Sequence, residues 1–183
     1  MITSTSSSQV KHVVNLQKKA KLRKEEKQFV VEGVKMVSEA PADRLVKVYV
    51  SETFKADNEE FLERMNYDSI GKDVLEIVTD NVFMRMADTQ TPQGIMAVVR
   101  MTDTDLEGIL SDKHNPLLLI IENLQDPGNL GTIVRMAEGA GVTGIIMSSN
   151  TVDIYNPKTI RSTMGSLYRV PVIYVDDISR EGT

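Results

Sequence analysis

The feature of this sequence that most restricts its fold is the alternation of short apolar runs with longer, helix-like stretches. Apolar runs of strand length occupy residues 29–31, 46–50, 75–78, 94–99, 117–121, 144–149 and 170–175. Helix-like stretches separate them around residues 33–40, 58–65, 80–86, 130–141 and 156–167. Strands that alternate with helices are typical of α/β proteins. We therefore predict an α/β fold, with parallel strands in its second half.

A polar, acidic segment interrupts this alternation and predicts two domains. Residues 101–116 are rich in Asp and Glu and end in Pro116, as expected for a junction. The Ser/Thr-rich residues 1–8 have little to bury and predict a disordered tail, with Ser8 as the cap of the first helix. The predicted order is a tail at 1–8, a domain at 9–100, a linker at 101–115 and a domain at 116–183.

Charge is distributed unevenly along the chain. The net charge is −5, yet residues 1–50 hold ten Lys/Arg and five Asp/Glu. A basic string at 18–27, predicted as a helix end and a charged connection, contains most of this excess. It indicates contacts to nucleic-acid phosphates through Lys18, Lys19, Lys21, Arg23 and Lys24. A solvated helix face explains the same string equally well.

The turn DPGNLG at 126–131 joins a predicted buried strand to a helix. Free backbone N–H groups at a helix N-terminus favour an anion, and this edge of an open sheet is where ligands bind. Gly128 and Gly131 permit close backbone approach, and Arg135 follows Gly131 by one helical turn. We therefore expect a phosphate at this turn. A plain tight turn with a surface arginine is the alternative.

Several classes of protein are excluded. There is no cysteine for disulfides, and no apolar run reaches the roughly 20 residues of a membrane span. The N-terminus does not resemble a secretory signal, so we expect a cytoplasmic protein. His12 and His114 have no further ligands at metal-binding spacing, so no metal site is predicted.

Two motifs resemble those of a known enzyme family. ENLQDPGNLGTIVRMAEGAG (122–141) resembles motif 1 of the SpoU (TrmH-like) branch of SPOUT methyltransferases, and NPKTIRSTMGSLYRVPV (156–172) resembles motif 2. QFVVEG (28–33) and TPQGIMAVV (91–99) resemble the ends of the substrate-binding domain that precedes many such enzymes. The resemblance implies a small α/β domain like ribosomal RNA-binding proteins, followed by the first half of a SPOUT domain, a parallel-sheet α/β fold that is normally knotted.

The resemblance also implies a function. Family members transfer a methyl group from S-adenosylmethionine to a ribose 2′-hydroxyl, usually in ribosomal or transfer RNA, and are usually homodimers. By motif position, Asn129 and Arg135 are the catalytic-side pair. A guanidinium stays cationic, so binding phosphate and stabilising alkoxide charge suit Arg135 better than acting as a base. Gly128, Gly131, Lys158 and Arg161 are candidate RNA contacts, and structural roles remain open for them.

The sequence departs from the family in one respect. The family's third motif, with a Gly-Asn-Glu-type loop and a later Ser-Leu-Asn run, is absent from these residues. Because that segment builds the donor pocket, we expect this chain to bind no S-adenosylmethionine and to be inactive alone. The first hypothesis is a fragment of an RNA 2′-O-ribose methyltransferase that acts on ribosomal RNA. The alternative is a non-catalytic RNA-binding module derived from such an enzyme.

Overall fold

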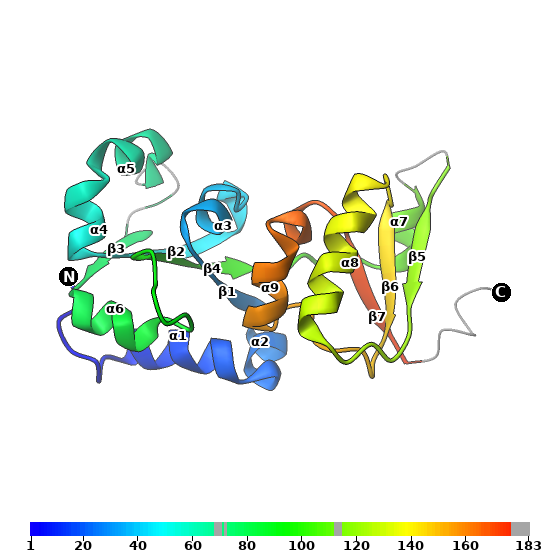
Figure 1. Ribbon diagram of the computed structural model, residues 1–183, viewed down its shortest axis with the longest axis horizontal. Coiled ribbons are helices and arrows are strands. Elements are labelled where there is room, and N and C mark those ends of the chain that lie inside the picture. Colours follow the sequence, from blue (N-terminus) through cyan, green and yellow to red (C-terminus); the bar gives the residue numbers. More distant parts are fainter. Residues whose placement is uncertain (68–70, 72, 112–114, 177–183) are drawn as a thin grey trace. The chain divides into compact units, whose positions relative to one another are not determined.

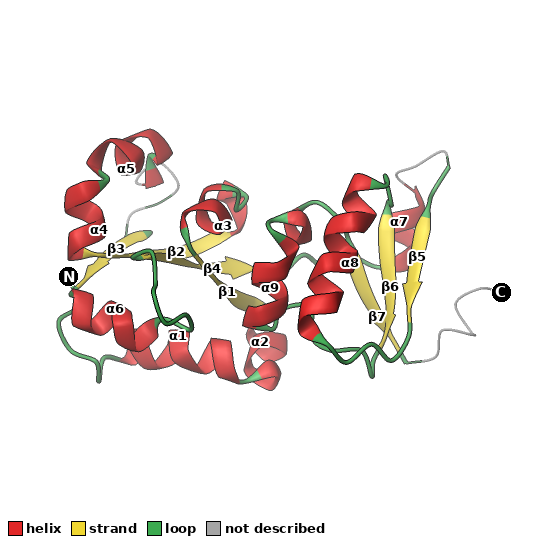
Figure 2. Ribbon diagram, viewed as in Figure 1, coloured by secondary structure: helices red, strands yellow, loops and turns green. Residues whose placement is uncertain are grey.

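A computed structural model describes residues 1–67, 71, 73–111 and 115–176. The chain divides into two compact units, Met1–Met101 and Thr102–Thr183, and each has its own sheet and core. Both units combine helices with a sheet, which confirms the predicted α/β class (Figure 2).

The first unit is built on a four-stranded sheet in the order β1-β4-β2-β3. Its strands are β1 (Gln28–Glu32), β2 (Leu45–Ser51), β3 (Leu75–Val78) and β4 (Ile95–Arg100). β4 is antiparallel to both neighbours, whereas β2 and β3 are parallel. Five successive residues of β4 are buried, because helices cover both faces of the sheet (Figure 1).

Helices α1 and α6 cover one face, and α3 and α4 lie on the other (Figure 1). Val13 and Leu16 of α1 pack with Phe83 and Met86 of α6 over alternate residues of the strands. The helices of this unit are α1 (Ser8–Lys18), α2 (Ala20–Glu26), α3 (Val34–Ser38), the 3-10 turn η1 (Ala42–Arg44), α4 (Glu52–Asp57), α5 (Glu59–Met65) and α6 (Asp80–Met86).

The N-terminal residues differ from the expected disordered tail. Ile2 forms a parallel bridge with Val78, where its N–H donates to the Ile77 carbonyl at 2.8 Å. The sheet edge offers unpaired backbone groups, and this short segment satisfies some of them. Helix α1 begins at Ser8 itself, so Ser8 is not the cap. The expected charged connection at 18–27 is instead a second helix, α2.

The second unit has a parallel sheet in the order β5-β6-β7. Its elements are α7 (Leu106–Ser111), β5 (Leu118–Ile121), α8 (Pro127–Gly139), β6 (Gly144–Ser148), α9 (Pro157–Thr163), the 3-10 turn η3 (Ser166–Tyr168) and β7 (Val172–Val175). Helix α8 packs on one face of the sheet and α7 on the other (Figure 1). The predicted βαβαβ order is confirmed.

Two expectations about this unit are wrong. The segment 101–115 was predicted as a linker, but its α7 buries Ile109 against Ile146 and Ile173 of the sheet. Leu106 and Ile109 lie three residues apart, which places both on one helix face. The strand before the turn at 126–131 was predicted to be buried, yet Ile120 of β5 is 56% exposed, and β5 lies at the edge of the sheet.

Candidate functional site

Two loops meet at the carboxyl edge of the second sheet and bond to each other. The Asn123 N–H donates to the Ser148 hydroxyl at 3.0 Å, and this hydroxyl lies 3.1 Å from that of Thr151. The Gln125 side-chain amide donates to the Asn150 carbonyl at 2.7 Å. Because the loops after β5 and β6 satisfy each other's polar groups, they form a fixed platform beside the N-terminus of α8.

The N-terminus of α8 is capped by a carboxylate. Asp126 accepts the Asn129 N–H at 2.6 Å, and Pro127 occupies the first turn. The sequence 126–131, predicted as a turn, is therefore largely helix. The anion that this helix end receives is the Asp126 carboxylate. A phosphate at the same N–H groups would have to displace it, so the half-buried Gly128 beside the cap is a weaker RNA contact than expected.

Gly131 has a packing role. It is buried, and a Cβ placed on it would lie 2.3 Å from the Ser162 Cβ and 2.7 Å from the Thr159 carbonyl oxygen. Only a residue without a side chain lets α8 approach α9 this closely. The expectation that Gly131 contacts RNA is wrong, because α9 covers it.

Arg135 and Asn129 are exposed on α8. Six helical positions separate them by about 9 Å along the axis and about 120° around it, so they lie on neighbouring faces. Among the described residues, the Arg135 side chain has no hydrogen bond or ion pair, and Glu122 at the end of β5 does not pair with it. The guanidinium is therefore available to a ligand.

Helix α9 presents the second set of predicted residues. Asn156 accepts the Lys158 N–H at 3.0 Å and Pro157 follows it, which confirms the predicted cap. Lys158 is exposed, and its Cε lies 4.0 Å from the Cβ position of Gly128. Lys158 therefore stands beside the N-terminus of α8. Arg161 is half-buried.

An ion pair that sequence reasoning missed fixes the other end of α8. Arg169 donates to both carboxylate oxygens of Glu138, one through Nε and one through Nη2 at 3.2 Å. Hydrogen bonds from Arg169 and Ser166 hold the pKa of Glu138 below its ordinary value. Nothing in the sequence marks these residues as partners, because 31 positions separate them.

In the first unit, the basic string divides into two kinds of residue. Lys18, Lys19, Lys21 and Lys24 are exposed, and Lys21 lies 3.8 Å from Glu25 in an ion pair of exposed side chains. Arg23 is only 3% exposed, and its Nη1 donates to the carbonyls of Leu16 and Gln17 at 2.7 and 2.9 Å. Those carbonyls lie at the C-terminus of α1, so Arg23 is a structural cap and not an RNA contact.

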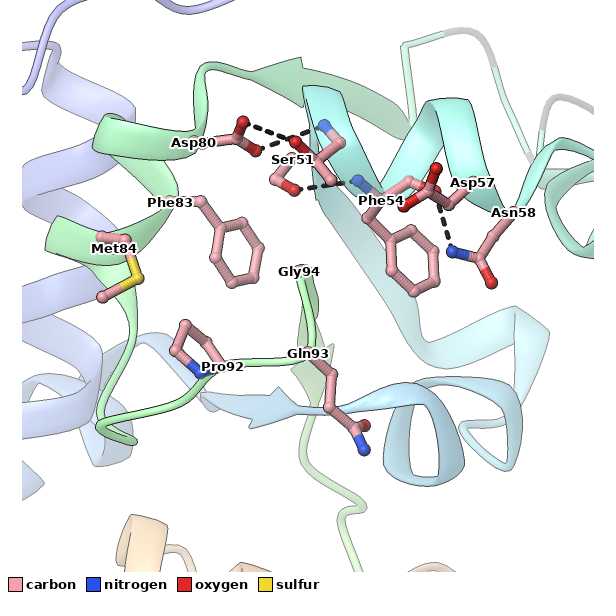
Figure 3. Close-up of a pocket in the computed structure, with 11 residues that line it drawn as sticks. Ser51, Phe54, Asp57, Asn58, Asp80, Phe83, Met84, Pro92, Gln93 and Gly94 are labelled. Carbon is pink, nitrogen blue, oxygen red and sulfur yellow. Dashed lines mark hydrogen bonds between the residues drawn. The ribbon is translucent and has the colours of Figure 1, made fainter.

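A pocket of about 330 Å³ opens at the carboxyl ends of β2 and β3 (Figure 3). Asp57 and Asp80 line it together with Phe54 and Phe83, and its lining contains no Lys or Arg. Hydrogen bonds from Thr53 and Ser51 lower the pKa of Asp80. Two carboxylates repel phosphate, so this pocket does not suit an RNA backbone.

Within 1–67, 71, 73–111 and 115–176, no three His, Cys, Asp or Glu side chains gather as metal ligands would. His12 lies 2.6 Å from Glu26, and His114 falls outside the described residues. No helix in this part of the chain has the length and apolarity to cross a membrane.

These features define a class: an α/β unit bearing a basic helix pair, followed by a parallel α/β unit with the motif residues at its helix α8. Two family profiles match accordingly. The MRM3-like substrate binding domain matches residues 7–97, and the SpoU rRNA Methylase family matches residues 116–181. The chain belongs to the SpoU methylase family.

Curated relatives and solved structures agree with this family assignment. The chain is 34% identical over 170 residues to "rRNA methyltransferase 3, mitochondrial" of Homo sapiens, which covers 88% of this chain and 38% of that protein. It is 36% identical over 112 residues to the 23S rRNA (guanosine(2553)-2′-O)-methyltransferase of Bacillus subtilis, covering 58% of this chain and 43% of that protein. An rRNA methyltransferase from Sinorhizobium meliloti matches with a TM-score of 0.77 and 25% identity, over 95% of this chain and 64% of that one.

The chain thus spans about two fifths of the length of these two curated relatives. An AdoMet-bound structure of the Sinorhizobium meliloti enzyme matches as well, with a TM-score of 0.76.

Proposed function

We propose that this chain supplies the RNA-binding and substrate-facing parts of an S-adenosylmethionine-dependent 2′-O-ribose methyltransferase acting on ribosomal RNA. The observation that carries the proposal is the combination, in one chain, of a substrate-binding domain with a SpoU region whose Arg135 is exposed and has no partner among the described residues. Relatives named as rRNA methyltransferases support the substrate class.

Arg135 is suited to two tasks on the substrate side. Its guanidinium offers fixed N–H donors to a phosphate, and its positive charge stabilises the negative charge that develops on the 2′-oxygen. Asn129 orients groups nearer the helix end. Because Asp126 caps that end and Gly131 is covered, RNA approaches α8 through Arg135 and Lys158 and not through the glycines.

The activity test uses a chain that includes the segment with the family's third motif. Arg135→Ala should lower kcat by about 100-fold or more, as loss of a charge-stabilising donor does in other enzymes. Met136→Ala, at the next exposed position of α8, is the control and should retain activity. Full activity of Arg135→Ala would refute the role given to this arginine.

We further propose that these 183 residues alone do not transfer methyl groups. Titration calorimetry of the chain with S-adenosylmethionine should show no binding tighter than about millimolar, because the family's third motif, which builds the donor pocket, is absent from these residues. Micromolar affinity would contradict this. The second candidate function, a non-catalytic RNA-binding module, is favoured by the basic α1–α2 pair. It predicts RNA binding by the chain together with absence of transfer even when the third motif is supplied.

A further inference from the structure

The first helix continues a basic surface beyond the string at 18–27. Residues 1–24 contain six Lys/Arg and no Asp or Glu, in a protein with 26 acidic residues. Lys11 and Lys18 lie seven positions apart on α1, which places them within about 20° of each other and about 10 Å apart along the axis. Both are exposed. A single face of α1 therefore carries positive charge along its length.

A groove accompanies this face near the start of α1. It has a volume of about 200 Å³ and is lined by Thr5, Val10, Lys11, Val14, Asn15 and Arg85. These residues come from the turn before α1, from α1 and from α6, which runs beside α1 (Figure 1). Valine side chains form the apolar part of the lining, whereas Thr5 and Asn15 add a hydroxyl and an amide.

The two cations of the groove have no carboxylate to balance them. Lys11 and Arg85 are exposed, and neither forms an ion pair or side-chain hydrogen bond among the described residues. Asp88 lies three positions after Arg85 but forms no ion pair with it among the described residues. Two other acidic residues, Glu26 and Asp80, have partners elsewhere: Glu26 pairs with His12, and Asp80 accepts hydrogen bonds from Thr53. Two like charges on one small groove repel each other, and an anion between them removes that cost.

We propose that this groove binds a backbone phosphate of RNA, held between Lys11 and Arg85, and that Lys18 continues the contact along α1. The inference rests on the proposed function, because it adds a phosphate site to the same RNA-binding surface. Lysine and arginine are the usual phosphate ligands, and hydroxyl and amide donors such as Thr5 and Asn15 complete such sites. The acidic pocket of Figure 3, in the same unit, has the opposite charge and takes no part.

The test measures binding of a fluorescein-labelled RNA hairpin to the full 183-residue chain at several salt concentrations. Each lost phosphate contact should reduce the slope of log K against log[salt] by about 1. Lys11→Gln with Arg85→Gln should therefore lower the slope by about 1 and weaken binding several-fold at low salt. Lys55→Gln is the control, because Lys55 is exposed and without an ion pair among the described residues but lies on α4, on the other face of the sheet.

The outcomes separate the two proposals. If the wild-type chain does not bind the hairpin, the proposed RNA-binding function of the chain fails. If it binds and neutralising Lys18, Lys19, Lys21 and Lys24 reduces the slope, but the Lys11/Arg85 variant matches Lys55→Gln, the groove is not a phosphate site. Both side chains are exposed, so the fold should persist. Charge reversal by Lys11→Glu should weaken binding further, and unchanged binding would overturn the inference.

Discussion

The two helix pairs that carry the sequence motifs use their residues differently. In α1–α2, all five lysines of the basic string at 18–27 remain at the surface, and Arg23 is the buried cation of the string. In α8–α9, Gly131 packs against Thr159 and Ser162, whereas Asn129, Arg135 and Lys158 remain exposed. A motif therefore mixes two kinds of residue, those that hold the helices and those left for a ligand.

Burial therefore separates the motif residues that stabilise each helix pair from those that can bind a ligand. The first pair gains charge at its surface because its buried face needs only the apolar residues Val10, Val13 and Leu16. The second pair lies so close that small residues are required at the contact, which restricts the motif more strongly. Substitutions at the structural members should affect stability, and substitutions at the exposed members should affect ligand binding.

The largest effect is expected at Gly131. Gly131→Ala places a methyl group 2.3 Å from the Ser162 Cβ and 2.7 Å from a backbone oxygen, so α8 and α9 must separate. We expect a loss of about 2 kcal/mol or more in the free energy of unfolding, since overpacking exceeds the gain of about 1 kcal/mol in helix propensity. Urea denaturation measures it. Gly139→Ala, in the same helix with nothing within 4 Å, should instead be neutral or stabilising. Equal effects of the two would contradict close packing.

Arg23 should show the next largest effect. Arg23→Met keeps the aliphatic chain but leaves the Leu16 and Gln17 carbonyls without their donor, at a cost of about 1–3 kcal/mol. The neighbouring Lys24→Met should change the free energy of unfolding by less than about 0.5 kcal/mol. In RNA binding the order reverses: Lys24→Met should reduce the salt slope and Arg23→Met should not. A stable Arg23→Met variant with a reduced slope would place Arg23 among the RNA contacts.

Local signals in the sequence were sufficient to predict the strands and the cap of α9. Apolar runs marked the strands β1 to β7, and Asn156 followed by Pro157 marked the start of α9, because both signals act within a few residues. The short helices α2, α4 and α7 were missed. α7 lies in a polar, acidic segment, and only two apolar residues three positions apart, Leu106 and Ile109, mark its buried face.

The roles of Arg23 and Gly131 could not be predicted from sequence. Arg23 stands among lysines in one basic string, and the direction of its side chain is set by how α2 folds back on α1. Gly131 looks like a turn glycine until the position of α9 is known, because its close contacts, Thr159 and Ser162, come much later in the chain. Both depend on tertiary contacts, and a linear pattern does not contain these. The exposed positions Asn129, Arg135 and Lys158 could be chosen from motif position, and their roles stay predictions.

The smallest effect is expected at the ion pair that closes α8. Hydrogen bonds from Arg169 and Ser166 lower the pKa of Glu138 below its ordinary 4.5. A lowered folded-state pKa stabilises the fold above the unfolded pKa, and this contribution is lost as pH falls through the folded value. Both side chains are partly exposed, so the contribution should stay below about 1 kcal/mol. Thermal unfolding from pH 6 to pH 3 should therefore show a slightly smaller loss of stability for Glu138→Gln than for wild type.

Glu122→Gln, which removes a carboxylate without an ion pair among the described residues, is the control. If Glu138→Gln follows the wild-type pH profile, the ion pair of Glu138 with Arg169 does not join α8 to η3 in solution. The close contact of α8 with α9 at Gly131 then holds α8 in place without the ion pair.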